Sequence, residues 1–277
     1  MNASLKFIRR IAVFKLMAIV LAACTATASL QPSPFPIPSE RYTAIMMKID
    51  GTVLHSVRPD AVRFPASLTK MMTLYLLFEG LSKRKFTLQS RIPVSANAAR
   101  KPASKLYLKA GETISVEEAI HALAIKSAND VATAVAEYLG GSEATFARIM
   151  TAHARSLGMN STIFRNASGL PDKRQVSTAR DMAKLSIALY KKHRRYYGYV
   201  GKSSFVFRGR TIRGHNRVLK QLRGADGIKT GYTRASGFNL ATSARTSKGR
   251  VVGVIMGENS GRSRNAHMVQ LFKRFAP

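Results

Sequence analysis

The segments of this 277-residue chain that resemble β-strands lie near its two ends, and the segments between them have helical patterns. Near the N-terminus, residues 42–49 and 52–57 flank Asp50-Gly51, a dipeptide typical of a two-residue hairpin turn. Further strands are expected at residues 203–208, 211–214, 228–232, 238–245 and 251–256. Because strands from both ends need partners, we expect an α+β domain in which they form one antiparallel sheet packed against helices, with a helical subdomain.

Helical patterns fill the middle of the chain. Pro65 and the apolar run at residues 71–77 predict a buried helix over residues 67–79. The segment Ser115-Val-Glu-Glu118 is a capping box, and the helix that it starts is expected to end around Ser127. Further helices are expected at residues 131–139, 143–157, 178–193 and 262–275.

Three short polar motifs are distributed over this frame in a fixed order: Ser67-Leu-Thr-Lys70, Ser127-Ala-Asn129 and Lys229-Thr-Gly231. Ser67 and Lys70 are three residues apart at a helix start, so their side chains share one face. A serine hydroxyl needs an adjacent base to become a nucleophile, and lysine is a base only when it is neutral. Burial beside a second cation, such as Lys229, favours the neutral form. The motifs therefore predict acyl transfer without histidine.

Other copies of these patterns occur, but their context is different. Ser82–Lys85 lies in a charged, solvated stretch, Ser95–Asn97 has no buried helix before it, and Ser263–Asn265 lies in a charged C-terminal segment. The chain has six scattered histidines and one cysteine, without metal-ligand spacing, so we expect no metal and no cofactor. It also has no Gly-x-Ser-x-Gly segment for a Ser-His-Asp hydrolase.

The N-terminus has the pattern of an export signal. Four basic residues precede a short apolar stretch at residues 16–23, which is too short to span a bilayer. We expect a signal peptide over residues 1–28, cleaved after Ala26-Thr-Ala28, with a lipobox that ends at Cys24 as the alternative. A proline-rich linker over residues 29–40 and a catalytic domain over residues 41–277 should follow. Either processing route exports the catalytic part, so a periplasmic protein is expected, lipid-anchored if Cys24 is used.

The chain has 45 basic and 14 acidic residues, a net charge of +31. Such an excess often indicates nucleic acid as a partner, but here the basic residues are dispersed and no nucleic-acid-binding motif accompanies them. For an exported protein, anionic envelope polymers or a membrane surface are the expected partners. A solvated basic surface without a partner is the alternative.

Longer segments around the motifs resemble D-alanyl-D-alanine carboxypeptidases, which are low-molecular-mass penicillin-binding proteins. The resemblance covers residues 41–256 and is carried by residues 65–72, 126–130, 164–171 and 226–233. It implies a β-lactamase/DD-peptidase-like fold and a serine-type enzyme that removes the terminal D-alanine from peptidoglycan stem peptides. The reaction would pass through an acyl-serine, and penicillins would acylate the same serine. Because the chain ends at Pro277, we expect neither the C-terminal β domain nor the amphipathic anchor of many relatives.

The resemblance also implies roles for individual residues. Ser67 would be the acylated nucleophile and Lys70 its general base, while Ser127 and Asn129 would line the opposite wall. The remaining roles fall to the third motif and the residue after it: Lys229 and Thr230 would bind the substrate carboxylate, Gly231 would leave room for the peptide, and Tyr232 would give an oxyanion-hole N–H together with Ser67.

Three alternatives remain open. A β-lactamase of class A uses a glutamate for deacylation, but no Glu-x-x-x-Asn segment lies between Ser127 and Lys229. A DD-endopeptidase that cuts murein cross-links is hard to distinguish from the sequence. A catalytically idle envelope-binding module is disfavoured by the intact motifs. We expect His153 and His215 to be structural, and we assign no chemistry to residues 166–171.

Overall fold

The structure, a computed structural model, describes residues 40–277. The predicted signal peptide, the lipobox at Cys24 and all of the predicted linker except its last residue lie outside the described residues, so these assignments stay predictions. Among the described residues, no helix is both long and apolar enough to cross a membrane.

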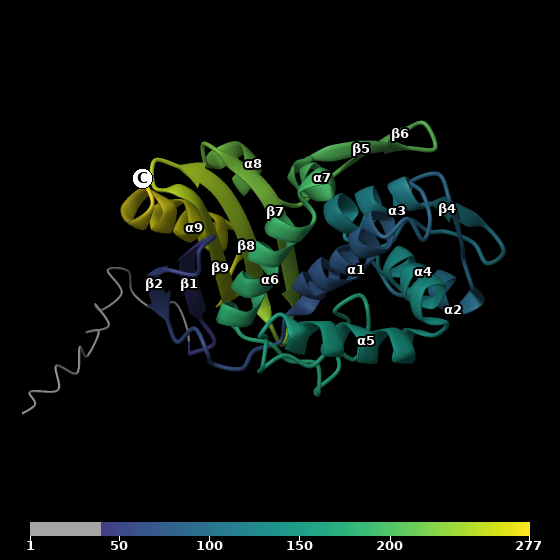
Figure 1. Cartoon of the computed structure of the whole chain (residues 1–277), viewed down its shortest axis with the longest axis horizontal. Helices are drawn as coiled ribbons and strands as arrows, with labels where there is room; N and C mark the ends of the chain where they lie inside the picture. The colour runs from purple at the N-terminus through teal and green to yellow at the C-terminus, as the bar shows by residue number, and fades with distance from the viewer. Residues whose placement is uncertain (1–39) are drawn as a thin grey trace, which may run out of the picture. The chain divides into compact units, whose positions relative to one another are not determined.

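Strands from both ends of the chain form one five-stranded antiparallel sheet in the order β2-β1-β9-β8-β7 (Figure 1). These strands are β1 (Thr43–Lys48), β2 (Val53–Val57), β7 (Ala225–Thr233), β8 (Gly237–Thr246) and β9 (Gly249–Glu258). The N-terminal β1 pairs with the C-terminal β9, from Thr43 opposite Met256 to Lys48 opposite Val251. The predicted meeting of the two ends is therefore confirmed. It leaves β7 at an edge of the sheet.

Each face of the sheet is covered by helices, because side chains of a strand alternate between its faces. On one face, Ala44 and Met46 pack with Met268, Leu271 and Phe272 of α9 (Gly261–Phe275). On the other face, alternate residues of β1 and β9 pack in the larger core with α6 (Ala179–Lys192). Figure 1 shows α6 and α9 on opposite sides of the sheet.

The predicted helical subdomain is built around α1 (Lys70–Ser82), of which 11 of 13 residues are buried. A 3-10 turn, Ala66–Thr69, leads into α1, so the predicted helix over residues 67–79 begins in a tighter geometry. The other elements of this part are β3 (Arg91–Pro93), α2 (Ala96–Ala99), β4 (Thr113–Ser115), α3 (Val116–His121), a π-helical turn (Ala122–Lys126), α4 (Asn129–Gly140) and α5 (Glu143–Ser156).

The hairpin of β5 (Ser204–Phe207) and β6 (Arg210–Arg213) forms a separate two-stranded sheet and does not join the main one. In β5, alternate residues are buried, and Phe205 stacks on His121 of α3. The hairpin thus packs its apolar side on helices. Short elements that the sequence analysis did not predict complete the fold: α7 (Arg194–Tyr197), a 3-10 turn (Gly198–Gly201) and α8 (Val218–Gln221).

Candidate active site

Ser67 lies in the 3-10 turn that leads into α1, where the chain passes close to a glycine of another segment. A Cβ atom on Gly169 would lie only 1.9 Å from the carbonyl oxygen of Ala66. Gly169 also has a positive φ of 85°, which glycine adopts without strain. Only glycine therefore allows the segment around residue 169 to pack directly against the serine turn.

Lys70 is fully buried, and its Nζ has three polar neighbours. It lies 2.7 Å from Asn129 Oδ1, 2.5 Å from the carbonyl oxygen of Ser168 and 3.3 Å from Ser67 Oγ. The first two are acceptors, whereas the hydroxyl of Ser67 is able to donate. A neutral amine has two N–H donors and one lone pair, so it can donate to both acceptors and leave its lone pair for the proton of Ser67.

Electrostatic effects also favour a neutral Lys70. Burial, followed by the charge of Lys229, holds the pKa of Lys70 well below its usual value. Asp130 and Glu143 act in the opposite direction but do not outweigh these effects. Glu143 is occupied by Lys101, at 2.7 Å, and by the backbone N–H of Ala167.

Ser127 and Asn129 lie on the other side of the cleft from Ser67 and Lys70, at the junction between the π-helical turn and α4. Ser127 ends the turn with a φ of 64°, in the left-handed region, and its buried Oγ has no hydrogen-bond partner among residues 40–277. Asn129 does not cap a helix with its side chain. Its Nδ2 donates to the carbonyl oxygen of Pro102, which fixes the amide so that Oδ1 accepts from Lys70.

Lys229 on β7 and Arg264 on α9 are two buried cations beside the same site, with 2 % and 6 % of their surface exposed. Lys229 Nζ donates to the carbonyl oxygen of Thr230, and the Arg264 guanidinium donates to Asn265 Oδ1 and to the carbonyl oxygen of Asn239. Within the part of the chain that the structure describes, neither forms an ion pair. Burial, and then the charge of Arg264, lowers the pKa of Lys229 to about 7. The arrangement suits a bound anion.

Residues from all three motifs border one cleft of about 480 Å³, and Lys70 and Lys229 are buried behind its wall. Its lining includes Ser67, Ser127, Asn129, Thr230, Gly231 and Tyr232. A Cβ on Gly231 would lie 3.1 Å from the backbone nitrogen of Ser67, so a side chain there would crowd the nucleophile. Tyr232 is 55 % exposed, and its ring stacks on that of Phe238. The structure therefore brings the three predicted motifs together.

The sequence analysis missed several contributors. Arg264 was one of 45 basic residues, and only the packing of α9 beside β8 places it at the cleft. Residues 166–171 were assigned no chemistry, yet Ser168 accepts from Lys70 and Ala167 accepts from Thr73 through their carbonyl oxygens. His215 lines the cleft, whereas His153 lies elsewhere, 3.7 Å from Glu79.

The serines of the alternative motif copies do not line the cleft. Ser82 ends α1, Ser95 caps α2, and Ser263 donates to Glu258. Among the described residues, no group of three or more His, Cys, Asp or Glu side chains is arranged to hold a metal ion.

Comparison with known proteins agrees with this geometry. A family model described as D-alanyl-D-alanine carboxypeptidase matches residues 29–260, so the chain belongs to this family. It is 33% identical to the D-alanyl-D-alanine carboxypeptidase DacF of Bacillus subtilis, over 84% of this chain and 61% of that protein. The chain spans 61% and 63% of the length of the first two curated relatives that it matches.

Solved structures share the fold. The D-alanyl-D-alanine carboxypeptidase DacD from Francisella tularensis aligns with a TM-score of 0.82 and 27% identity, over 86% of this chain and 70% of that one. Penicillin-binding protein D2 from Listeria monocytogenes in the ampicillin-bound form aligns with a TM-score of 0.74 and 28% identity. The alignment covers 82% of this chain and 95% of that one. The predicted family and the predicted α+β, DD-peptidase-like fold are confirmed.

The lowered pKa of Lys229 predicts that the folding stability of the protein depends on pH. Between pH 7 and the usual lysine pKa of about 10.4, the unfolded chain binds a proton at this residue that the folded chain does not. Folding stability should therefore rise with pH in this window, by up to about 1.4 kcal/mol per pH unit from this group. The Lys229→Met variant should have a larger free energy of unfolding than wild type near pH 7.5. This difference between the two proteins should shrink toward pH 9.5.

Urea unfolding of both proteins at pH 7.5, 8.5 and 9.5 measures this difference. Comparing the two proteins removes the contributions of groups that titrate in both. Parallel stability curves would show that Lys229 is not held neutral.

Proposed function

We propose that this protein is a serine-type D-Ala-D-Ala carboxypeptidase that removes the terminal D-alanine from peptidoglycan stem peptides through an acyl-serine. One observation carries the proposal: Ser67 Oγ lies 3.3 Å from a fully buried lysine whose two other contacts are acceptors. Membership of the D-alanyl-D-alanine carboxypeptidase family supports the choice of substrate.

In the proposed reaction, neutral Lys70 takes the proton of Ser67 while Oγ attacks the carbonyl carbon of the terminal peptide bond. The backbone N–H groups of Ser67 and Tyr232 stabilise the oxyanion, and one such donor is typically worth about 2.7–4 kcal/mol. The leaving amine then needs a proton. Ser127 suits its delivery, because its Oγ borders the cleft and has no partner among residues 40–277. It would give its proton to the amine and take from Lys70 the proton that Ser67 had lost. Water finally hydrolyses the acyl-serine.

The two buried cations support an exopeptidase. Lys229 and Arg264 have no carboxylate partner among residues 40–277, so a carboxylate at the end of the substrate would supply the missing negative charge. Thr230, between Lys229 and the reaction centre, offers a hydroxyl to the same group. Charge-assisted hydrogen bonds of this kind are worth roughly 1.5–3 kcal/mol.

Penicillins are proposed to acylate the same serine, as the ampicillin-bound form of the similar penicillin-binding protein D2 from Listeria monocytogenes suggests. Slow release of the penicilloyl group is expected, because none of the residues that line the cleft is acidic. This favours a penicillin-binding protein over a β-lactamase of class A.

Ser67 is predicted to be the site of acylation. Labelled penicillin should attach to the peptide that contains Ser67, and the label should disappear in Ser67→Ala. Ser82→Ala, which changes the other Ser-x-x-Lys copy, is the matched control and should label like wild type. Mass spectrometry of the digested proteins distinguishes the two, and a label retained by Ser67→Ala would refute the assignment.

Lys229 is predicted to recognise the free carboxylate. Amidation of the substrate's terminal carboxylate should lower kcat/KM of wild type by about one to two orders of magnitude. In Lys229→Ala the preference for the acid over the amide should shrink strongly, because one of the two charges proposed to bind the carboxylate is gone and only Arg264 remains. If wild type cleaves both equally, Lys229 does not read the carboxylate, and the DD-endopeptidase alternative becomes the better one.

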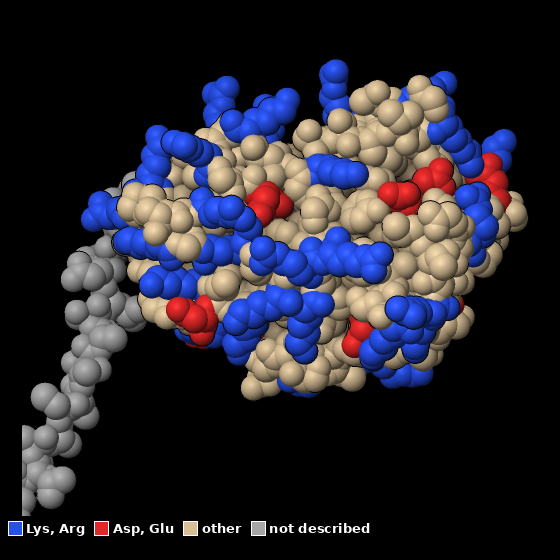
Figure 2. All heavy atoms as spheres, turned by 45° about the horizontal axis from the view of Figure 1, so that its top comes forward, with Lys and Arg blue, Asp and Glu red and all other residues tan. Residues whose placement is uncertain are grey.

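We further propose that the enzyme is exported to the periplasm and that its basic face binds anionic envelope polymers. The basic face consists of exposed residues on and around α8 and α9: Arg217, Lys220, Arg223, Arg262 and Lys273. Residues 209–225 and 259–277, which carry these elements, contain no acidic residue. Figure 2 shows basic side chains spread widely over this side of the molecule, with few acidic ones.

A polymer fits this face better than a membrane surface. The face contains a groove of about 860 Å³ lined in part by Arg217, Gln221, Arg262 and Gln270, which a flat lipid surface would not enter. The exposed large apolar residues of the described chain all lie outside α8 and α9, so the face has no apolar anchor for lipid. Anchoring through Cys24 remains a separate prediction, outside the described residues.

The triple variant Arg217→Gln, Arg262→Gln, Lys273→Gln should therefore elute from an immobilised polyanion at clearly lower salt than wild type. A matched triple variant, Lys83→Gln, Lys85→Gln, Lys191→Gln, removes the same charge elsewhere and should elute much closer to wild type. Equal shifts in both would mean that only net charge matters. Sedimentation with anionic phospholipid vesicles tests the membrane alternative.

A further inference from the structure

Glu143, the first residue of α5, does not line the catalytic cleft, yet its contacts reach the segment that holds the general base. The proposed reaction gives it no role, and none of the three motifs includes it. Its side chain is only 14 % exposed. A carboxylate that is largely buried needs partners, and these partners show what the side chain does.

The two carboxylate oxygens of Glu143 have different partners. Oε2 accepts from Lys101 Nζ at 2.7 Å. Oε1 accepts from the backbone N–H of Ala167 at 3.2 Å and from the hydroxyl of Thr133 at 3.3 Å. The ion pair with Lys101 thus holds one oxygen and leaves the other directed at the backbone of residue 167. A hydrogen bond to an ionised acceptor is roughly twice as strong as a neutral one, so this tether is a firm one.

The tethered backbone carries the acceptors for two side chains of α1. The carbonyl oxygen of Ala167 accepts from Thr73 Oγ1 at 2.7 Å, and that of Ser168 accepts from Lys70 Nζ at 2.5 Å. Lys70 and Thr73 are three residues apart and therefore lie on one face of the helix. Glu143 thus fixes the backbone one residue before the carbonyl group that accepts from the general base.

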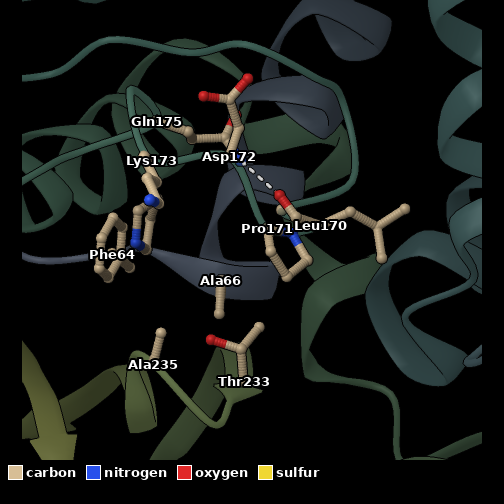
Figure 3. A pocket seen from close by; sticks show the side chains of 11 residues that line it. Phe64, Ala66, Leu170, Pro171, Asp172, Lys173, Gln175, Thr233 and Ala235 are labelled. Carbon is tan, nitrogen blue, oxygen red and sulfur yellow. Dashed lines mark hydrogen bonds between the residues drawn. The ribbon is translucent and has the colours of Figure 1, made fainter.

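The same segment is held at the serine turn by its own residues. Asn166 Oδ1 accepts from the backbone N–H of Gly169 at 2.7 Å, and Gly169 packs directly against Ala66. The next residue, Leu170, lines an apolar cavity of about 280 Å³ together with Ala66 (Figure 3). Among residues 40–277, no carboxylate other than that of Glu143 hydrogen bonds to the backbone of residues 166–169. Glu143 is therefore the anionic anchor of this segment.

The charge of Glu143 also acts on Lys70. Burial and the charge of Lys229 on β7 hold the pKa of Lys70 well below its usual value, whereas Asp130 on α4 and Glu143 on α5 oppose them. Substitution of Glu143 by a neutral residue leaves Lys229 and Asp130 unchanged. It therefore lowers the pKa of Lys70 further, because one of the two opposing charges is lost.

We propose that Glu143 is a positioning residue for the general base. Held by Lys101, it fixes the backbone of residues 167–168 so that Lys70 Nζ is kept beside Ser67 Oγ. Glu143 touches neither the nucleophile nor the substrate and acts only through this backbone. The proposal rests on the proposed carboxypeptidase function and adds a residue outside the cleft on which the rate of acylation depends.

Acylation of Ser67 by a penicillin tests the positional effect, because stopped-flow kinetics separates the dissociation constant of the first complex from the acylation rate constant. In Glu143→Ala the rate constant should fall about tenfold at the pH optimum, since a displaced base takes the proton more slowly. The dissociation constant should stay within about twofold of wild type, because Glu143 does not line the cleft. Glu143→Gln keeps an acceptor oxygen for Ala167 and should recover to within about threefold of wild type.

The pH profile of acylation is a second readout, one that a purely structural role would not move. The rate falls on the acidic side as Lys70 takes up a proton. In Glu143→Gln this acidic limb should move to lower pH by about 0.5 pH unit, because a charge that favours protonated Lys70 is gone. The alkaline limb, which is assigned to loss of the charge of Lys229, should stay in place, since the pKa of Lys229 responds to burial and to Arg264.

The matched control is Glu137→Gln. Glu137 lies on α4 and borders the same surface hollow as Glu143, but its carboxylate accepts from Asn97 and has no hydrogen bond to residues 166–169. Both the acylation rate constant and the pH profile of this variant should match those of wild type.

The outcomes are distinguishable. An unchanged acylation rate constant in folded Glu143→Ala, or an unmoved acidic limb in Glu143→Gln, would overturn the positioning role and leave the carboxypeptidase intact. If Glu143→Ala does not fold, the acidic limb of Glu143→Gln decides alone. Absence of acylation of Ser67 in wild type would instead refute the proposed function on which this role rests.

Discussion

Burial of Lys70 without a carboxylate partner is the constraint around which the centre of this protein is organised. A charged lysine there would carry a desolvation penalty of several kcal/mol, so the fold favours the neutral amine. Its contacts come from separate segments: the serine turn, the start of α4 and the carbonyl oxygen of Ser168. Each segment must be in place for the amine to be both satisfied and neutral.

Two buried basic side chains beside the cleft also reduce the stability of the fold. Burial and the charge of Arg264 lower the pKa of Lys229 to about 7, and burial lowers the pKa of Arg264 to about 10 although Glu258 acts in the opposite direction. No carboxylate among residues 40–277 pairs with either side chain. Such an arrangement works against stability and is typical of a functional site, where an anionic ligand supplies the missing charge.

Residues 164–175 link the reaction centre to an apolar cavity of about 280 Å³ that adjoins the cleft. Through Ser168 this segment contacts Lys70, and Leu170 and Pro171 form part of the cavity wall. Its own conformation depends on Asn166 and Gln175, which hydrogen bond to one another and to the backbone around them. The same hydrogen-bonded segment thus supports both Lys70 and the wall of this cavity.

The sequence by itself determined the three motifs, the class of chemistry and the α+β frame, because helix capping, hairpin turns and the Ser-x-x-Lys spacing are local features. It did not determine that β5 and β6 would stay outside the main sheet, since β-pairing depends on which apolar faces meet. Nor did it single out Arg264, Ser168 or the cavity beside Leu170. These arise only when α9, β7 and residues 164–175 pack around the serine turn, and contacts between segments so distant in sequence are set by tertiary packing alone.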